Sequence, residues 1–316
     1  MTGNGHITRS IQMINSLKSE GFEVDIVTSG NNSQLKLPFE VKHRFKGLSF
    51  FYDRKGGINW IKTLLSINAK EFFKESIDLS SYDLVISDFE PVSARCAKKQ
   101  NIKSIGLSNQ YSFYSKKMKR PFIKNIFSEL FIKYFAKCDE HIGIGYDKFD
   151  NFIVLPIVNS DLLNKTNIDS NFYLIYLPSI SSDTLIKEIS KINSYNWKIY
   201  SPDIIENHKH NNIELKKLDK KEFTNDLLSC SGVITASGFS TTSEALVLNK
   251  KLWSIPIKGQ YEQKCNAEFL KSLGIFTKSF NSNNINKWLN NFNTIQYQWE
   301  DPTTEIIKKI KQYAEN

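Results

Sequence analysis

The chain has 316 residues, of which 40% are hydrophobic and 24% are charged; these values are typical of a soluble globular protein and exclude a disordered chain. This length favours two domains of about 150 residues each. The formal net charge is +9, but only five of the 42 basic residues are arginine. Surfaces that read nucleic acid usually rely on arginine, so no nucleic-acid partner is expected.

The four cysteines, Cys96, Cys138, Cys230 and Cys265, lie far apart without C-x-x-C spacing. Neither a zinc cluster nor a disulfide framework is predicted, and reduced thiols in a cytoplasm are expected. No apolar run reaches about 18 residues, and the N-terminus lacks the apolar region of a signal peptide. We therefore expect a cytoplasmic protein that neither spans a membrane nor is exported.

In the first half of the chain, strand-like apolar runs alternate with helical patterns, which predicts a parallel sheet. The expected helices cover residues 7–20, 59–76 and 91–100, and the expected strands cover 22–29, 82–87, 102–108 and 141–145. A helix opening near His6 should follow a first strand, yet only a few residues precede it. This domain is expected to lack its first strand, unless the true start is earlier.

A second series of the same kind begins near Phe172. Its expected strands cover residues 172–177, 197–200, 232–236 and 252–255, and its expected helices cover 184–192, 221–228, 241–248 and 260–273. The predicted fold is α/β, with two Rossmann-like doubly wound domains, residues 1–155 and 156–300, facing a cleft. Residues 301–316 are expected to form a helix that crosses back to the first domain. Ligands of such sheets bind outside the carboxyl ends of the strands.

The segment 232–246 predicts a phosphate site. An apolar strand ends at Ala236, a small turn follows, and a helix starts near Thr241. This geometry directs backbone N–H groups and the positive end of a helix dipole at the cleft, which binds phosphate without a metal. Small residues that allow a close approach of the ligand are Ser237, Gly238, Ser240, Thr241 and Thr242. The alternative is a capping box in which Thr241 caps the helix and Glu244 reaches back.

The next strand and helix add a cluster of polar side chains. Gln260, Glu262, Gln263 and Asn266 follow the strand at 252–255 and are suited to pairing with sugar hydroxyls. A purely structural turn needs a single cap, so four such groups indicate a ligand site.

These two segments resemble the C-terminal half of GT-B glycosyltransferases of the MurG-like and UDP-glycosyltransferase type, especially a mostly uncharacterised MurG-like family of bacteria and archaea. The resemblance implies that Glu244 binds the ribose, that Glu262 and Gln263 bind the donor sugar, and that Ser240, Thr241 and Thr242 hold the diphosphate. The chain departs from the family pattern at 249–251, where relatives usually have Gly-Lys-Pro, and at 177–182, where many have a Gly-rich loop.

On the other side of the cleft, residues 3–10 form a Gly-rich loop that runs into a helix. It is a poor dinucleotide fingerprint, since the third glycine is missing. The resemblance makes His6 the candidate general base, with Asp88 as the carboxylate that orients it. The alternatives are that His6 only caps its helix or contacts phosphate, and that Asp88 caps the helix at 91–100. Gly5, Arg9 and Asn109 are further cleft candidates.

Residues 116–135 combine a basic cluster with a helix rich in Phe and Ile. Such a stretch can lie on anionic lipid, which would suit a lipid-linked acceptor, and predicts weak peripheral contact with the inner face of the cytoplasmic membrane. The alternative is that the aromatic residues pack on the first sheet.

Taken together, the sequence predicts an inverting glycosyltransferase that uses a nucleotide-sugar donor, most simply a UDP-sugar, in cell-envelope polysaccharide or glycolipid synthesis. No cofactor and no metal are expected, because backbone amides can stabilise the leaving diphosphate. Two alternatives remain: a UDP-sugar 2-epimerase of the same fold and a non-catalytic relative that binds sugar nucleotides.

Overall fold

The computed structural model describes residues 4–30, 37–46, 74–158, 160–163 and 170–315. The helix expected at 59–76 lies almost wholly outside these residues. Among the described helices, none is long and apolar enough to cross a lipid bilayer. All four cysteines are buried free thiols.

A four-stranded parallel sheet forms the N-terminal half. Its order is β3 (Leu84–Ser87), β4 (Lys103–Ser108), β5 (Glu140–Ile144) and β6 (Ile153–Val154). A separate parallel pair joins β1 (Val27–Ser29) to β2 (His43–Phe45). The strand expected at 22–29 is therefore only three residues long, because its pairing is limited to those that face β2.

A six-stranded sheet forms the C-terminal half, in the order β12 (Lys251–Ile255), β11 (Gly232–Ala236), β7 (Phe172–Tyr176), β8 (Asn196–Tyr200), β10 (Ile213–Lys216) and β9 (His208–His210). All neighbours are parallel except β9, which runs antiparallel to β10 at the edge. Neither β9 nor β10 was expected. Their sequence is short and mostly polar, so local pattern carries no strand signal, and pairing with β8 decides their structure.

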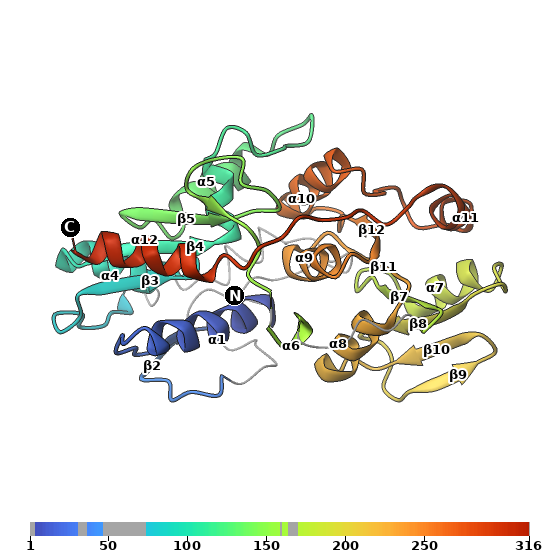
Figure 1. Cartoon of the computed structure of the whole chain (residues 1–316), viewed down its shortest axis with the longest axis horizontal. Coiled ribbons are helices and arrows are strands. Elements are labelled where there is room, and N and C mark those ends of the chain that lie inside the picture. The colour runs from blue at the N-terminus through green and yellow to red at the C-terminus, as the bar shows by residue number, and fades with distance from the viewer. Residues whose placement is uncertain (1–3, 31–36, 47–73, 159, 164–169, 316) are drawn as a thin grey trace.

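Helices flank both sheets (Figure 1). In the N-terminal half they are α1 (Asn4–Ser19), α4 (Pro91–Gln100), the 3-10 helix η1 (Asn109–Tyr114) and α5 (Ile126–Tyr134). Further along the chain lie α6 (Ser160–Leu163), α7 (Ser182–Ile189), α8 (Lys220–Ser229), α9 (Phe239–Val247), α10 (Tyr261–Ser272), α11 (Ser282–Asn291) and α12 (Thr303–Glu315). This alternation of strands and helices is the α/β organisation expected from the sequence.

The helix α12 lies over the N-terminal half, far from the strands that precede it in the chain (Figure 1). Its residues Ile306, Ile307 and Ile310 are buried in one apolar cluster with Met13 and Leu17 of α1. These isoleucines are spaced along one face of the helix, and an exposed apolar face is unfavourable. The helix therefore buries this face against the N-terminal half.

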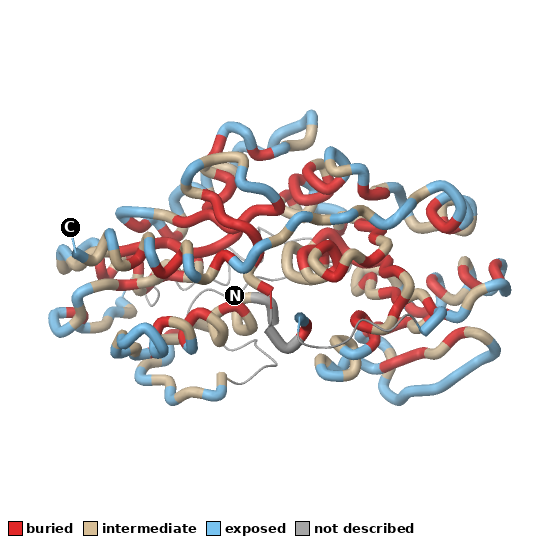
Figure 2. Tube along the Cα trace, viewed as in Figure 1, coloured by how far each residue is buried: buried red, intermediate tan, exposed pale blue. Residues whose placement is uncertain are grey.

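The stretch before and along α5 agrees only in part with the interpretation of residues 116–135 as core. Phe122, Ile123 and Phe127 are almost fully exposed, whereas Ser128 and Ile132 of the same stretch are buried. Figure 2 shows this region largely exposed, in contrast to the buried sheets. Phe122, Phe127 and Tyr134 are therefore exposed, whereas Phe131 and Phe135 pack against Phe89 beside the first sheet.

Candidate active site

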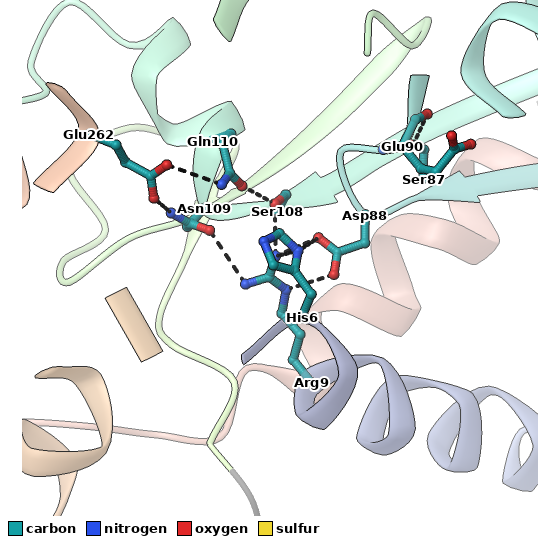
Figure 3. Close-up of polar contacts among 9 residues, drawn as sticks. All are labelled: His6, Arg9, Ser87, Asp88, Glu90, Ser108, Asn109, Gln110 and Glu262. Atoms are coloured by element: carbon teal, nitrogen blue, oxygen red, sulfur yellow. Dashed lines mark hydrogen bonds and ion pairs between the residues drawn. The ribbon is translucent and has the colours of Figure 1, made fainter. Parts of the chain in front are cut away.

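The imidazole of His6 and the carboxylate of Asp88 lie side by side (Figure 3). His6 lies in the first turn of α1, Asp88 directly follows β3, and His6 Nδ1 is 2.9 Å from Asp88 Oδ1. About a fifth of each side chain is exposed to solvent, 22% for His6 and 23% for Asp88. The start of α1 and the end of β3 lie together, so that two residues 82 positions apart in the sequence are in contact.

The turn that presents Asp88 is held by its neighbours. Phe89 has a φ of +54°, which costs a residue with a side chain about 1–3 kcal/mol. Its ring is buried against Tyr111, and the Ser87 hydroxyl both donates to the Glu90 carbonyl and accepts from the Glu90 amide. Glu90 is the N-cap of α4. The interpretation of Asp88 as that cap is therefore wrong, and its carboxylate is available to other partners.

Arg9 is the buried cation of the site, with a side chain only 7% exposed. Its Nε donates to Asp88 Oδ2 at 3.0 Å and its Nη2 donates to Asp88 Oδ1 at 2.5 Å. Nη2 also donates to Ser108 Oγ at 2.9 Å. Burial acts to raise the pKa of Asp88, but the charges of Arg9 and His6 outweigh it and hold that pKa well below its usual range. Asp88 is therefore ionised.

The proton on His6 follows from this arrangement. Nδ1 of His6 lies within hydrogen-bond distance of both Asp88 and Arg9 Nη2. A guanidinium nitrogen can only donate, and Nη2 has two hydrogens, which Asp88 and Ser108 accept. Nδ1 therefore donates its proton to the Asp88 carboxylate, so that Nε2 is the nitrogen that carries no proton in the neutral form of the ring.

Glu262 links the two halves of the protein. It lies in the first turn of α10, and its Oε1 accepts a hydrogen bond from Asn109 Nδ2 at 2.8 Å. Its Oε2 accepts from Gln110 Nε2 at 3.3 Å. Asn109 Oδ1 in turn accepts from Arg9 at 3.4 Å. A continuous chain of polar contacts thus runs from the His6–Asp88 pair to Glu262 (Figure 3).

The turn between β11 and α9 leaves room for a ligand. Gly238 is the N-cap of α9 with φ −71° and ψ 134°, and no side chain caps the helix. A Cβ atom built on Gly238 would meet nothing within 4 Å. The capping box proposed for Thr241 and Glu244 is wrong, because Thr241 lies inside the helix. The start of α9, with Ser240 and Thr241 partly exposed, is suited to binding an anion.

Four of the candidate donor residues have internal hydrogen bonds. The Ser237 hydroxyl pairs with Ser254, and the Thr242 hydroxyl bonds to the Gly238 carbonyl. Asn266 donates to the Ser237 carbonyl at 3.1 Å, and the Gln263 side-chain oxygen accepts from the Ile257 amide at 3.0 Å. Ser237, Thr242 and Asn266 are fully buried. These side chains fix the two turns at the ends of β11 and β12.

Lys220, which the sequence patterns did not single out, lies near enough to Glu244 to affect its pKa. Burial raises the pKa of Glu244 to about 7, with Lys220 acting in the opposite direction. Lys220 begins α8 in the C-terminal half, and its Nζ donates to the Thr8 hydroxyl on α1. One lysine among many carries no motif, so only the packing of α8 beside α1 reveals it.

The remaining candidates lie close to this centre. Gln260 is the N-cap residue of α10, directly before Tyr261 and Glu262. Gly5 lies in the first turn of α1, next to His6. Among the described residues no cluster of three metal-binding side chains is found. Two surface hollows, of about 550 and 350 Å³, are lined by none of the candidate residues.

Solved structures with the same arrangement are GT-B glycosyltransferases and related proteins. UGT89C1 of Arabidopsis thaliana, complexed with UDP, matches with a TM-score of 0.58 and 14% identity, covering 98% of this chain and 92% of that one. The MnaA–UDP co-structure of S. aureus matches with a TM-score of 0.57 and 13% identity, covering 100% and 95%. The glycosyltransferase SnogD of Streptomyces nogalater matches with a TM-score of 0.52 and 14% identity, covering 99% and 93%.

These likenesses establish the GT-B fold and confirm the fold class predicted from the sequence. The model of Glycosyl transferase family 1 matches residues 2–293. The chain belongs to this family, and it is a glycosyltransferase of the GT-B type. No curated protein sequence matches it.

Proposed function

We propose that the protein transfers a sugar from a UDP-sugar to the hydroxyl of an acceptor in one inverting displacement. The observation that carries the proposal is the 2.9 Å contact of His6 Nδ1 with the Asp88 carboxylate, which leaves Nε2 of the neutral imidazole as the proton acceptor. An imidazole held by a carboxylate in this way is suited to general-base catalysis near neutral pH.

In the proposed reaction, Nε2 of His6 takes the proton of the acceptor hydroxyl. The freed oxygen forms a bond to the anomeric carbon of the donor, and the bond from that carbon to the diphosphate breaks on the opposite face. The electron pair leaves with UDP. Asp88 keeps its negative charge beside the imidazolium that forms, and stabilises it.

The donor would lie along the ends of β11 and β12. Its diphosphate would bind at the start of α9, where Gly238 allows close approach. The helix dipole and Lys220 offset the negative charge that develops on the leaving group, so the proposed reaction needs no metal. Glu244 would accept hydrogen bonds from the ribose hydroxyls. The solved structures named above that contain UDP support this choice of nucleotide.

The donor sugar would bind Glu262. Asn109 and Gln110 occupy both oxygens of its carboxylate, and sugar hydroxyls are donors of the same kind. Binding would therefore exchange two amide donors for sugar hydroxyls. The anomeric carbon would then lie between Glu262 and the His6–Asp88 pair, as the displacement requires.

The nucleotide is tested by a thermal-shift panel of UDP, GDP and TDP. A ligand that binds only the folded state raises the melting temperature. We expect UDP to give the largest rise. No rise with any of the three at millimolar concentration would overturn the donor site.

The reaction is tested with water as the acceptor, since slow donor hydrolysis needs no second substrate. Proton NMR during turnover of UDP-glucose and UDP-N-acetylglucosamine should show the β-anomer of the free sugar first, because the donors are α-linked. Release of the α-anomer first would refute inversion. Formation of an epimeric UDP-sugar from the donor alone would instead indicate a 2-epimerase.

A further inference from the structure

The exposed apolar side chains of this protein are concentrated in one place. Nine large hydrophobic residues are strongly exposed in the described part of the chain, and six of them lie between residues 122 and 134. We call these six the α5 patch: Phe122, Ile123, Ile126, Phe127, Leu130 and Tyr134. Single exposed hydrophobic residues are ordinary, but a contiguous group marks an interaction surface.

The helical part of the α5 patch forms one face. With about 100° per residue, Ile126, Phe127, Leu130 and Tyr134 lie within an arc of about 100°. The buried residues Ser128 and Ile132 lie on the opposite side. Phe122 and Ile123, with exposed fractions of 103% and 82%, extend the face into the preceding loop. The helical face is therefore apolar and exposed, and the loop before it adds two more exposed apolar side chains.

Basic residues border the α5 patch. Exposed lysines occupy positions 116, 117, 119, 124, 133 and 137. The segment 116–137 has a single acidic residue, Glu129, and its carboxylate is paired with Arg120 at 2.7 Å. A second copy of the chain would bring like charges together at this surface. An anionic surface with an apolar interior fits both features.

The α5 patch is also joined to the proposed donor site. Glu129 of α5 accepts a hydrogen bond from the hydroxyl of Tyr261. Tyr261 is the first residue of α10 and directly precedes Glu262. A surface bound by α5 would therefore lie beside the start of α10.

We propose that the α5 patch docks the protein onto an anionic lipid bilayer, with the apolar side chains at the level of the acyl chains and the lysines among the headgroups. Helices of this kind bind by apolar burial together with attraction to anionic lipid. The proposal does not rest on the reaction proposed above, because docking requires neither donor nor acceptor.

The test is flotation of the purified protein with vesicles of phosphatidylcholine alone or mixed with phosphatidylglycerol. We expect binding to the mixed vesicles that falls as salt is raised. The triple variant Phe122→Ser, Ile123→Ser, Phe127→Ser should lose at least about 100-fold in partitioning, since each side chain loses its apolar burial. The variant Lys119→Gln, Lys124→Gln should lose about 30-fold, at roughly fivefold for each lysine.

Matched controls lie outside the segment 116–137. Ile205 is 86% exposed and isolated, so Ile205→Ser should bind vesicles like the wild type, as should the variant Lys287→Gln, Lys308→Gln. All variants should keep the wild-type melting temperature and the shift produced by UDP. The proposal is overturned if the wild type does not float with anionic vesicles, or if the controls lose as much binding. It is also overturned if sedimentation shows that the α5 patch holds two copies of the chain together.

Discussion

Asn109 of the N-terminal half donates a hydrogen bond to Glu262 of the C-terminal half at 2.8 Å. The same asparagine accepts one from Arg9. The residue proposed to bind the donor sugar is therefore connected to the residues proposed to activate the acceptor.

Replacement of Glu262 should separate sugar binding from nucleotide binding. In Glu262→Gln one charged acceptor becomes a neutral amide, which costs about 1.5 kcal/mol at one charge-assisted hydrogen bond. The affinity for the UDP-sugar should fall about tenfold, while the affinity for UDP stays unchanged. Isothermal titration with both ligands makes the comparison. An equal loss for UDP would place Glu262 at the nucleotide instead.

Removal of the imidazole should abolish most turnover but leave donor binding intact. His6→Ala should lower kcat by about 10²–10⁴-fold, the usual contribution of a general base. UDP should still raise the melting temperature as in the wild type. Turnover is measured by UDP release. A kcat within a factor of about three of wild type would show that another group takes the proton.

Arg9 should matter for stability as well as for turnover. Its side chain is 7% exposed and paired with Asp88, so Arg9→Met should lower the free energy of unfolding by about 3 kcal/mol. The double variant Arg9→Met, Asp88→Asn should cost less than the sum of the single changes, because each single change leaves a charge without its partner. Urea unfolding measures all three.

Lys311→Met is the control for Arg9→Met. Lys311 forms an exposed pair with Glu20, with side chains 41% and 48% exposed, and its loss should cost under about 1 kcal/mol. Equal destabilisation by the two substitutions would mean that the Arg9 pair is no stronger than a surface pair.

Glu244 should make both stability and UDP binding depend on pH. Burial raises its pKa to about 7 from an ordinary value of 4.5, so the folded protein holds this proton more tightly than the unfolded chain. The stability that this group contributes is complete below pH 4.5 and is lost as the pH rises through about 7. In Glu244→Gln, the free energy of unfolding should lack this part of the pH dependence.

The affinity for UDP should rise with pH, whereas the stability that Glu244 contributes falls. An ionised Glu244 accepts two ribose hydroxyls, so UDP affinity should rise between about pH 6 and pH 8 in the wild type. Comparison with Glu244→Gln removes the contribution of the diphosphate's own titration. Parallel pH curves for the two proteins would exclude Glu244 from the nucleotide site.

Gly238 should be required for the ligand and not for the fold. Its φ of −71° suits any residue and its Cβ position is open. Gly238→Val should therefore cost only about 1 kcal/mol of stability, but its side chain would fill the space proposed for the diphosphate. UDP affinity should fall more than about tenfold.

Gly21→Ala should lower stability and leave UDP binding unchanged. Gly21 has a φ of +86°, so a side chain there costs about 1 kcal/mol or more, far from the proposed donor site. Its UDP affinity should equal that of the wild type. If Gly238→Val binds UDP normally, the start of α9 is not the diphosphate site.

The sequence by itself determined the alternation of elements and most of the candidate site. The strand at 232–236 and the helix at 91–100 have the bounds predicted from their apolar spacing and from the proline at position 91. The local sequence is sufficient to predict these bounds, because burial, capping and turn chemistry all favour the same element within a few residues. His6, Asp88 and Glu262 likewise lie at the ends of elements, where the sequence predicted them.

Only the tertiary structure decided how these residues use their side chains. Glu90 replaces Asp88 as the helix cap, Asp88 instead accepts a hydrogen bond from Nδ1 of His6, and Lys220 joins the site from α8. The same holds for the α5 patch, whose apolar residues suit a core equally well in the sequence. Burial and charge pairing depend on partners distant in the chain, and a pattern read along the sequence contains no information about those partners.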